Sequence, residues 1–250
     1  MTARFLQRVS AVAERTPKFK AHPFDIPFVV GLELEFESPV TFFVGENGSG
    51  KSTLLEAIAA LAELPASGGS RNEVDQAFAP EHQSKLAPAL RPSFRERPRD
   101  GYFLRAEFLA HFASLLDQRN ADPGFAGDAY GRYGGKSLHK QSHGEAFLSV
   151  LKERVKSGLF LFDEPEVALS PQRQLALLLL MHELVETGET QFIIATHSPI
   201  LLTFPGATIV SFDVAALKKV SLEETSHYRL TKGILDNPAG YWRHLTNEGQ

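Results

Sequence analysis

The sequence of 250 residues contains no cysteine and no long apolar segment. The absence of cysteine excludes disulfides, thiolate metal ligands and cysteine nucleophiles. A membrane-spanning helix needs about 20 consecutive apolar residues, whereas the most apolar segment, Leu175–Met181, is short and lies between Arg173 and His182. We expect this segment to form a buried helix and the chain not to insert into a membrane. The basic N-terminal segment lacks the apolar core of a secretory signal, which predicts a cytoplasmic protein.

An overall excess of positive charge is also absent, since the formal net charge is −4. No global basic field would therefore attract nucleic acid. The segment Lys85–Arg99 is a local exception, because it contains five basic residues and only one acid, Glu96. Its basic residues are Lys85, Arg91, Arg95, Arg97 and Arg99. A solvated loop with helical pieces is the simpler interpretation, and a surface for a partner or nucleic acid is the alternative.

Short apolar segments alternate with segments of helical periodicity along the chain. We expect strands over residues 28–37, 41–44, 101–107, 159–162, 191–196 and 207–212. We expect helices over residues 51–64, from the end of the strand at 101–107 to residue 116, and over residues 142–157. Two more are expected, one between the strands at 159–162 and 191–196 and one from residue 237 onward. This order predicts a single α/β domain over residues 1–250 with a mostly parallel sheet, interrupted by an insertion over about residues 65–157.

The segment GENGSGKS matches the complete pattern of a phosphate-binding loop, with an apolar strand before it and an amphipathic helix after it. Its residues are Gly45, Glu46, Asn47, Gly48, Ser49, Gly50, Lys51 and Ser52, with Thr53 next. Glycines let several backbone N–H groups point at phosphate oxygens at the positive end of a helix. We expect Lys51 to reach the β- and γ-phosphates of ATP and Ser52 to bind Mg²⁺. A glycine-rich turn unrelated to nucleotides is the alternative.

Three polar residues follow predicted buried strands further along the chain. Asp163 and Glu164 end the strand LFLF, where Asp163 suits Mg²⁺ binding and Glu164 suits polarisation of the attacking water. His197 follows the next strand and could hydrogen-bond the γ-phosphate. Each also has a plainer explanation, since acids often end strands at the surface and a histidine at a strand end is often structural.

The segment QSHGE contains Ser142 and, three residues later, Glu145, which is the pattern of a helix capping box. A capped helix N-terminus still carries the positive end of the helix dipole. Ser142, Gly144 and Glu145 are therefore candidates both for starting a helix and for contacting a phosphate.

The order GENGSGKS, QSHGE, LFLFDEPEVALS and ATHS resembles the ATP-binding-cassette (ABC) class of P-loop ATPases from about Phe28 to Phe212. The resemblance implies a mostly parallel sheet with an antiparallel β part and a helical subdomain. It also implies ATP hydrolysis with Mg²⁺, catalytic roles for Lys51, Glu164 and His197, and an ATP-dependent head-to-tail homodimer. In that dimer Ser142 and Gly144 would contact the γ-phosphate bound by the second protomer, and the loop at residues 168–170 would cross the interface. Gln141 and His143 depart from the family's commonest residues.

The segments DEPEVALSP and ATHSPILL are more similar to soluble ATPases related to RecF, SMC and overcoming-lysogeny-defect proteins than to transporter subunits. The ending HYRLTKGILDNP…YWRHL further resembles small stand-alone bacterial "AAA family" ATPases. The interval between Ser52 and Ser142 is too short for the coiled-coil arms of SMC proteins. The resemblance implies a conformational switch for an unidentified effector or a nucleic-acid transaction. The alternatives are a transporter's ATP-binding subunit and a repair or defence ATPase acting with a nuclease.

Two expected contacts have no clear residue in the sequence. The family's lid strand usually ends in a glutamine that touches Mg²⁺ and water, and the equivalent segment GYFLRAE offers only Arg105 or Glu107. An aromatic residue among Phe19, Phe24 and Phe28 could stack on adenine, although core packing is the commoner role.

Overall fold

The computed structural model describes residues 3–17, 21–65, 84–122, 124–125, 127–213 and 215–246. Its main element is a six-stranded sheet in the order β5-β6-β7-β3-β8-β9, in which the first five strands are parallel and β9 is antiparallel to β8. The strands are β3 (Val40–Val44), β5 (Gly101–Arg105), β6 (Gly158–Asp163), β7 (Thr190–Ala195), β8 (Thr208–Ser211) and β9 (Lys218–Val220). The predicted mostly parallel α/β architecture is confirmed.

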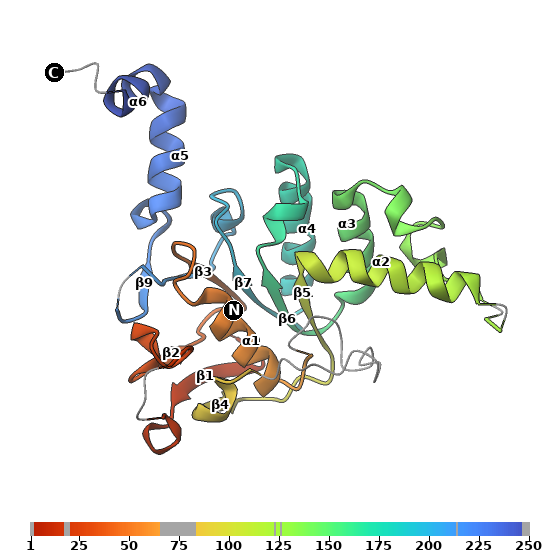
Figure 1. The fold of residues 1–250 in the computed structure, drawn as a ribbon, viewed down its shortest axis with the longest axis horizontal. Helices are drawn as coiled ribbons and strands as arrows, with labels where there is room; N and C mark the ends of the chain where they lie inside the picture. Colours follow the sequence, from red (N-terminus) through yellow and green to blue (C-terminus); the bar gives the residue numbers. More distant parts are fainter. Residues whose placement is uncertain are drawn as a thin grey trace.

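A smaller antiparallel sheet in the order β2-β1-β4 lies on one side of the main sheet (Figure 1). Its strands are β1 (Leu6–Ala11), β2 (Glu33–Glu35) and β4 (Leu90–Phe94). Helix α1 (Lys51–Leu61) lies between the two sheets, where Leu54 and Ile58 are fully buried with Phe43 of β3. The packing of α1 on β3 holds the start of α1, and therefore the segment that connects the two, at the end of β3.

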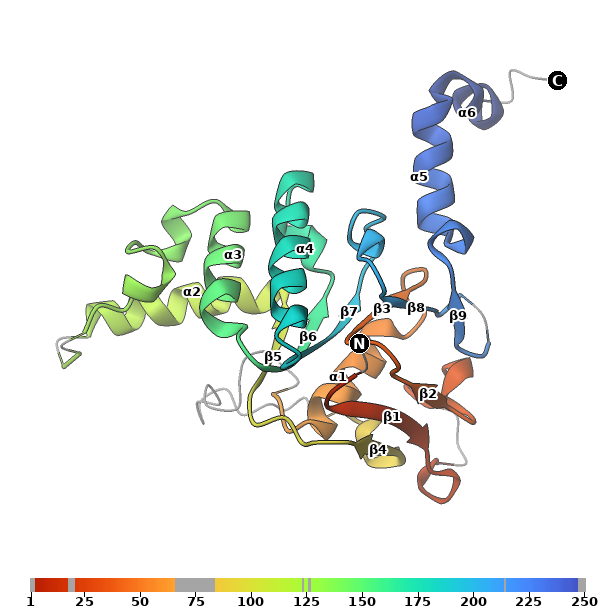
Figure 2. The same ribbon diagram turned by 180° about the vertical axis from the view of Figure 1, so that it is seen from behind.

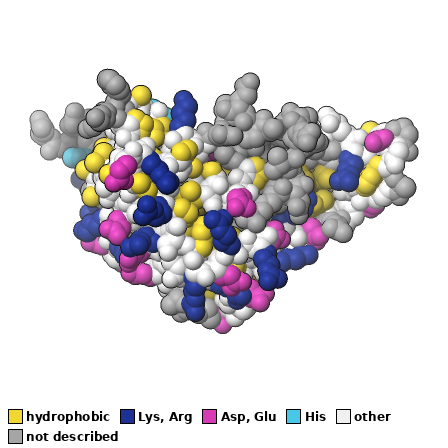
Figure 3. All heavy atoms as spheres, turned by 90° about the horizontal axis from the view of Figure 1, so that it is seen from below, with side chains coloured by type: hydrophobic (Ala, Val, Ile, Leu, Met, Phe, Trp, Pro, Cys, Tyr) yellow, Lys and Arg dark blue, Asp and Glu magenta, His cyan; other side chains and the backbone are white. Residues whose placement is uncertain are grey.

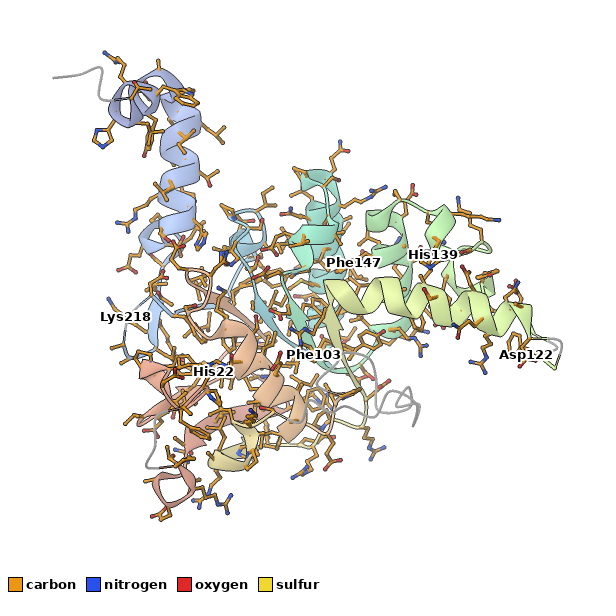
Figure 4. The ribbon with its side chains drawn as sticks, in the orientation of Figure 1. His22, Phe103, Asp122, His139, Phe147 and Lys218 are labelled. Atoms are coloured by element: carbon orange, nitrogen blue, oxygen red, sulfur yellow. The ribbon has the colours of Figure 1, made fainter. Side chains whose placement is uncertain are left out.

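Three helices cover the opposite face of the main sheet (Figure 2). They are α2 (Ala106–Ala121), α3 (His143–Arg154) and α4 (Pro171–Glu186). Successive side chains of a strand point to opposite faces, so Phe42 packs into this second core while Phe43 packs against α1. Figure 4 labels one aromatic residue of each core, Phe103 on the α1 side and Phe147 on the α3 side.

The chain ends in two helices, α5 (Ser226–Asp236) and α6 (Pro238–Leu245), that project away from both sheets (Figure 1). Neither helix contains a buried residue. The predicted helix start at Asn237 is confirmed, because its side chain accepts a hydrogen bond from the backbone N–H of Gly240 at 3.0 Å. We call α5 and α6 together the C-terminal arm.

Short 3-10 helices connect these elements in the described part of the chain. They are η1 (Ala13–Arg15), η2 (Pro27–Val29), η5 (Ala87–Ala89), η6 (Gly131–Tyr133), η7 (Leu138–Lys140), η8 (Pro165–Ala168), η9 (Leu201–Thr203) and η10 (Leu222–Glu224). No helix among the described residues has both the length and the apolar character that crossing a membrane requires.

Three sequence predictions about local structure are wrong. The strand predicted over residues 28–37 is limited to β2, because the chain first forms η2 and then turns at Gly31, whose φ is +74°. The Lys85–Arg99 segment contains strand β4 as well as the helical piece η5, because β4 pairs with β1. The apolar segment of α4 is not buried all round, since Leu175 and Leu179 are 57% and 60% exposed.

One buried side chain joins the two sheets. The side-chain oxygen of Gln191 on β7 accepts hydrogen bonds from the backbone N–H groups of Phe5 and Leu6 at 3.0 and 2.9 Å, and its amide donates to the Leu6 carbonyl at 2.9 Å. Gln191 is fully buried. Unpaired buried backbone groups cost free energy, so this residue fixes the N-terminal strand onto the main sheet.

We expect the substitution Gln191→Leu to lower the free energy of unfolding by about 2–5 kcal/mol, because it leaves buried backbone groups without partners. Urea denaturation followed by circular dichroism would measure this change. Gln172→Leu, at an exposed position of α4, is the control and is expected to stay within about 0.5 kcal/mol of wild type. Equal effects of the two substitutions would contradict the bridging role of Gln191.

Candidate nucleotide-binding site

The segment Gly45–Gly50 forms a tight loop between the end of β3 and the start of α1. Gly50 precedes the helix in a left-handed conformation with φ 96°, and a Cβ atom there would lie 2.7 Å from the ring of Phe28. Only glycine therefore fits at this position. The loop ends at the N-terminus of an 11-residue helix, so its backbone N–H groups and the helix dipole suit binding of an anion.

Lys51 is buried at the start of α1 with 4% of its surface exposed. Its ammonium donates hydrogen bonds to the carbonyls of Gly45 at 2.6 Å and Glu46 at 3.0 Å, and thus lies within the loop. Burial lowers the pKa of Lys51, and the charges of Glu164, Asp163, Asp213 and Glu46 oppose that shift. The loop therefore surrounds a desolvated cation, which fits a polyphosphate chain.

Ser52 and Asp163 meet across two different elements, although 111 residues separate them. The Ser52 hydroxyl donates a hydrogen bond to Asp163 Oδ1 at 2.9 Å. Burial raises the pKa of Asp163, while the Ser52 hydrogen bond and the charge of Arg105 oppose this. A hydroxyl and a carboxylate oxygen side by side are the hard ligands that Mg²⁺ prefers.

No cluster of three or more His, Cys, Asp or Glu side chains with metal-binding geometry occurs among the described residues. Mg²⁺ in nucleotide sites usually binds one or two protein oxygens and takes its remaining ligands from phosphate and water. Ser52 and Asp163 are the residues that would hold it. When bound, the ion would neutralise charge on the phosphates.

Glu164 and His197 lie next to each other at the ends of β6 and β7. Glu164 Oε1 is 3.3 Å from His197 Nε2, and the Glu164 side chain is 38% exposed. Glu164 adopts a left-handed backbone conformation with φ 50°, which is uncommon for a residue other than glycine. Burial and the charge of Lys51 lower the pKa of His197, so we expect a neutral imidazole at neutral pH.

The predicted helix start at QSHGE is present as the N-terminus of α3. The Glu145 carboxylate accepts a hydrogen bond from the backbone N–H of Ser142 at 3.0 Å, which forms one half of the capping box. Glu145 also pairs with Arg173 of α4 at 3.4 Å. A Cβ atom on Gly144 would lie 3.1 Å from the carbonyl of Ala168, so the segment 142–145 lies next to the predicted interface loop.

The structure does not bring all candidate residues to one place. Helix α3 lies beyond β5, whereas the phosphate loop follows β3, which β6 and β7 separate from β5 (Figure 1). Among the described residues, no hydrogen bond or ion pair joins Ser142 or Gly144 to the loop. Lys51, Ser52 and Asp163 thus form one group with Glu164 and His197, and the α3 N-terminus stands apart.

The residues considered for the lid-strand contact and for adenine stacking have the following surroundings. The Arg105 guanidinium pairs with Glu56 at 2.8 Å and lies 3.7 Å from Asp163 Oδ2, while the side chain of Glu107 lies outside the described part of the chain. Phe19 is also outside it, and Phe24 packs half-buried on the core. Phe28 is 4% exposed and packs edge-on against Phe212, with ring centroids 5.1 Å apart.

Two hollows flank the phosphate loop. The larger, of about 740 Å³, lies between the loop and the base of the C-terminal arm, and Gly48, Lys218 and Arg229 are among its lining residues. The smaller, of about 450 Å³, includes His22 and Phe28 in its wall. Figure 4 labels Lys218 and His22, one on each hollow. Both have room for the part of a nucleotide beyond its phosphates.

Sequence reasoning missed several residues that the fold adds to the site. Asp213, after β8, accepts a hydrogen bond from the backbone N–H of Glu46 at 2.8 Å. Glu166 accepts one from the backbone N–H of His197 at 2.6 Å, and His227 on α5 lies 2.8 Å from His197 Nδ1. The position of Asp213, directly after the predicted strand at 207–212, is an indication in the sequence that it belongs to the site. The sequence around His227 offers no comparable indication.

The basic Lys85–Arg99 segment does not form a uniformly positive surface. Arg97 pairs with Glu63 at 3.0 Å, and Glu96 pairs with Arg4 at 3.4 Å. The face shown in Figure 3 has basic and acidic side chains interspersed. This arrangement gives no support to a nucleic-acid surface there.

Comparisons with known families match two segments of the chain. A family model described as an AAA domain matches residues 22–86, which include the phosphate loop. A second AAA-domain model, with AbiEii toxin and Type IV TA system in its description, matches residues 145–203, which include Asp163, Glu164 and His197. No curated protein sequence gives a significant match.

Several solved structures align with most of this chain at low sequence identity. A metal-chelate type ABC transporter in an inward-facing conformation aligns with a TM-score of 0.53 and 14% identity, over 90% of this chain and 88% of that chain. The SMC head domain from Thermotoga maritima gives 0.42 and 15%, over 86% and 98%. CbiO1 of Clostridium perfringens, part of an ABC transporter complex, gives 0.43 and 18%, over 87% and 91%. Only the first score is high enough to support a shared fold. It shows the fold alone, and the two AAA-domain matches support a P-loop ATPase.

We expect Lys51→Ala to weaken ATP binding by about 100-fold or more, because the variant lacks the buried cation expected to hydrogen-bond the phosphates. Calorimetric titration with MgATP would measure the affinity. Lys152→Ala, at an exposed position of α3, is the control and should bind as the wild type does. Unchanged affinity of the Lys51→Ala protein would show that the loop does not hold the phosphates.

Proposed function

We propose that this chain is an ATP-driven conformational switch, in which two copies associate head to tail with ATP at their interface and separate after hydrolysis. The observation that carries the proposal is the division of the candidate residues into two groups. Lys51, Ser52 and Glu164 lie together, whereas the capped N-terminus of α3 lies beyond β5, away from the phosphate loop of the same chain. A second copy could supply that phosphate.

The first group has the composition that phosphoryl transfer requires. Lys51 would stabilise charge on the β- and γ-phosphates, and Ser52 and Asp163 would hold Mg²⁺. The Glu164 carboxylate would accept a proton from the attacking water while the new bond to the γ-phosphorus forms and the bond to the ADP oxygen breaks. His197 Nε2, 3.3 Å from Glu164, would donate a hydrogen bond to a γ-phosphate oxygen. Most of the acceleration would come from fixed charges rather than covalent chemistry.

The second group suits a phosphate brought by another molecule. Helix α3 has 12 residues, its cap residue Ser142 is exposed, and a capped N-terminus still carries the positive end of the helix dipole. The neighbouring loop at Ala168 is close to Gly144 and carries Val167, which is 70% exposed. The apolar Val167 side chain is therefore available to an interface next to the α3 N-terminus.

We expect the Glu164→Gln protein to become dimeric with saturating MgATP, because it would bind ATP without hydrolysing it. Light scattering after gel filtration would show a doubling of mass with MgATP and a monomer without it. If the mass did not change at saturating MgATP, the proposed dimer would be wrong.

Two further substitutions in the Glu164→Gln background separate helix capping from phosphate contact. Asp and Asn both cap helices as well as Ser does, but only Asp adds a negative charge where the partner's γ-phosphate would lie. Ser142→Asn should therefore still dimerise, whereas Ser142→Asp should remain monomeric with its own ATP bound. Dimers formed equally by both would exclude phosphate contact at Ser142.

A second candidate function has one observation in its favour. The family model that matches residues 145–203 carries the description "AAA domain, putative AbiEii toxin, Type IV TA system". We therefore propose a component of a toxin–antitoxin system as the alternative to a switch for another effector. Growth inhibition on expression of the wild type, relieved in the Lys51→Ala protein, would favour this alternative, and normal growth would count against it.

A further inference from the structure

The C-terminal arm contributes a side chain to the candidate catalytic centre. His227, in the first turn of α5, places Nε2 2.8 Å from Nδ1 of His197, with the two rings at 64° and their centroids 4.8 Å apart. The start of α5 is fixed by Thr225, whose hydroxyl accepts a hydrogen bond from the backbone N–H of Tyr228 at 3.3 Å. The imidazole of His197 therefore has one neighbour on each ring nitrogen, His227 at Nδ1 and Glu164 at Nε2.

Several titratable groups surround His197. They are Lys51 from α1, Glu164 and Glu166 from the turn after β6, and His227 from α5. Burial acts first to lower the pKa of His197, and the charge of Lys51 acts in the same direction. A neutral imidazole carries one proton, and the neighbour of the other nitrogen decides which nitrogen holds it.

We propose that His227 is a positioning residue that donates its Nε2–H to Nδ1 of His197 and so keeps the His197 proton on Nε2. This inference rests on the proposed ATP hydrolysis, in which Nε2–H would donate to the γ-phosphate. The opposite direction would leave an unprotonated Nε2 of His197 facing the Glu164 carboxylate at 3.3 Å, which places two acceptors against each other.

A second observation also indicates that His227 donates the hydrogen bond to His197. Among the described residues, Nδ1 of His227 is buried and has no hydrogen-bond partner. If His227 were the acceptor at Nε2, its own proton would sit on this Nδ1 as a buried donor without a partner. Orphaned buried donors are rarer in proteins than under-satisfied acceptors. Donation from His227 to His197 leaves only an unpaired acceptor at Nδ1.

Donation of the hydrogen bond from His227 to His197 also suits catalysis. Nε2 of His197 is buried and makes no well-aligned hydrogen bond within the described part of the chain, although Glu164 is close. With its proton held on Nε2, His197 keeps a donor beside Glu164, and a phosphate oxygen would replace Glu164 as its acceptor. His227 therefore makes the base of the C-terminal arm part of the hydrolytic arrangement.

Two substitutions test the role of His227. Leu removes the donor at similar size, and Gln can place an amide N–H near the position of Nε2. We expect His227→Leu to lower the kcat for ATP by about 10–100-fold, the range found when the hydrogen-bond partner of a metal-bound histidine is lost, with little change in KM. We expect His227→Gln to stay within about threefold of wild type. Equal loss in both variants, or wild-type kcat in His227→Leu, would overturn the proposal.

Nitrogen-15 NMR of histidine-labelled protein provides a readout that does not depend on turnover. In the wild type at pH 8 we expect His197 to show the Nε2–H tautomer, and in His227→Leu a mixture of tautomers. An Nδ1–H tautomer in the wild type would overturn the proposal even if the Leu variant did not fold. Absence of ATPase activity in the wild type would instead count against the proposed function, and the wild-type tautomer would still decide the role of His227.

Discussion

The parallel pairing of β3, β7 and β6 is the constraint on which the site depends. In this register Ala195 of β7 lies opposite Phe43 of β3 on one side and Asp163 of β6 on the other. The three strands therefore end at the same level, and the residues that follow them meet at one edge. The Ser52–Asp163 hydrogen bond of 2.9 Å, between residues 111 positions apart, is a direct consequence of this register.

Burial at this edge makes the charged groups dependent on one another. Burial lowers the pKa of Lys51 and raises those of Asp163 and Glu166, so each group by itself loses part of its preference for the charged form. The carboxylates favour the Lys51 cation, and Arg105 favours the Asp163 anion. A low local dielectric also strengthens any interaction with a bound phosphate. Burial therefore both imposes the desolvation cost on these groups and would strengthen their interaction with a bound phosphate.

The sequence predicted the parts of the site that are local in the chain. The phosphate loop, the Asp163–Glu164 pair and the α3 cap each depend on a few consecutive residues and on the element that follows or precedes them. Pairing over long distances could not be predicted in this way. Strand β1 was missed because its partners, β2 and β4, lie far along the chain, and Gln191 joins β7 to β1 across 185 residues. The strand prediction at 28–37 was too long because the alternation covers only residues 32–36, while the residues before it form η2 and a turn at Gly31.

His227 is the clearest example of a residue that only the fold identifies. The C-terminal arm has no buried residue, and Leu235 and Trp242 are 73% and 67% exposed, so core packing does not fix its direction. Its described contacts with the site are the His227–His197 hydrogen bond and the cleft that Arg229 shares with the phosphate loop. Since coupling between two sites is reciprocal, any group that orients His197 for phosphate must also be oriented by it. If ATP binds as proposed, the His197–His227 pair is the described contact through which a bound phosphate and the C-terminal arm would influence each other.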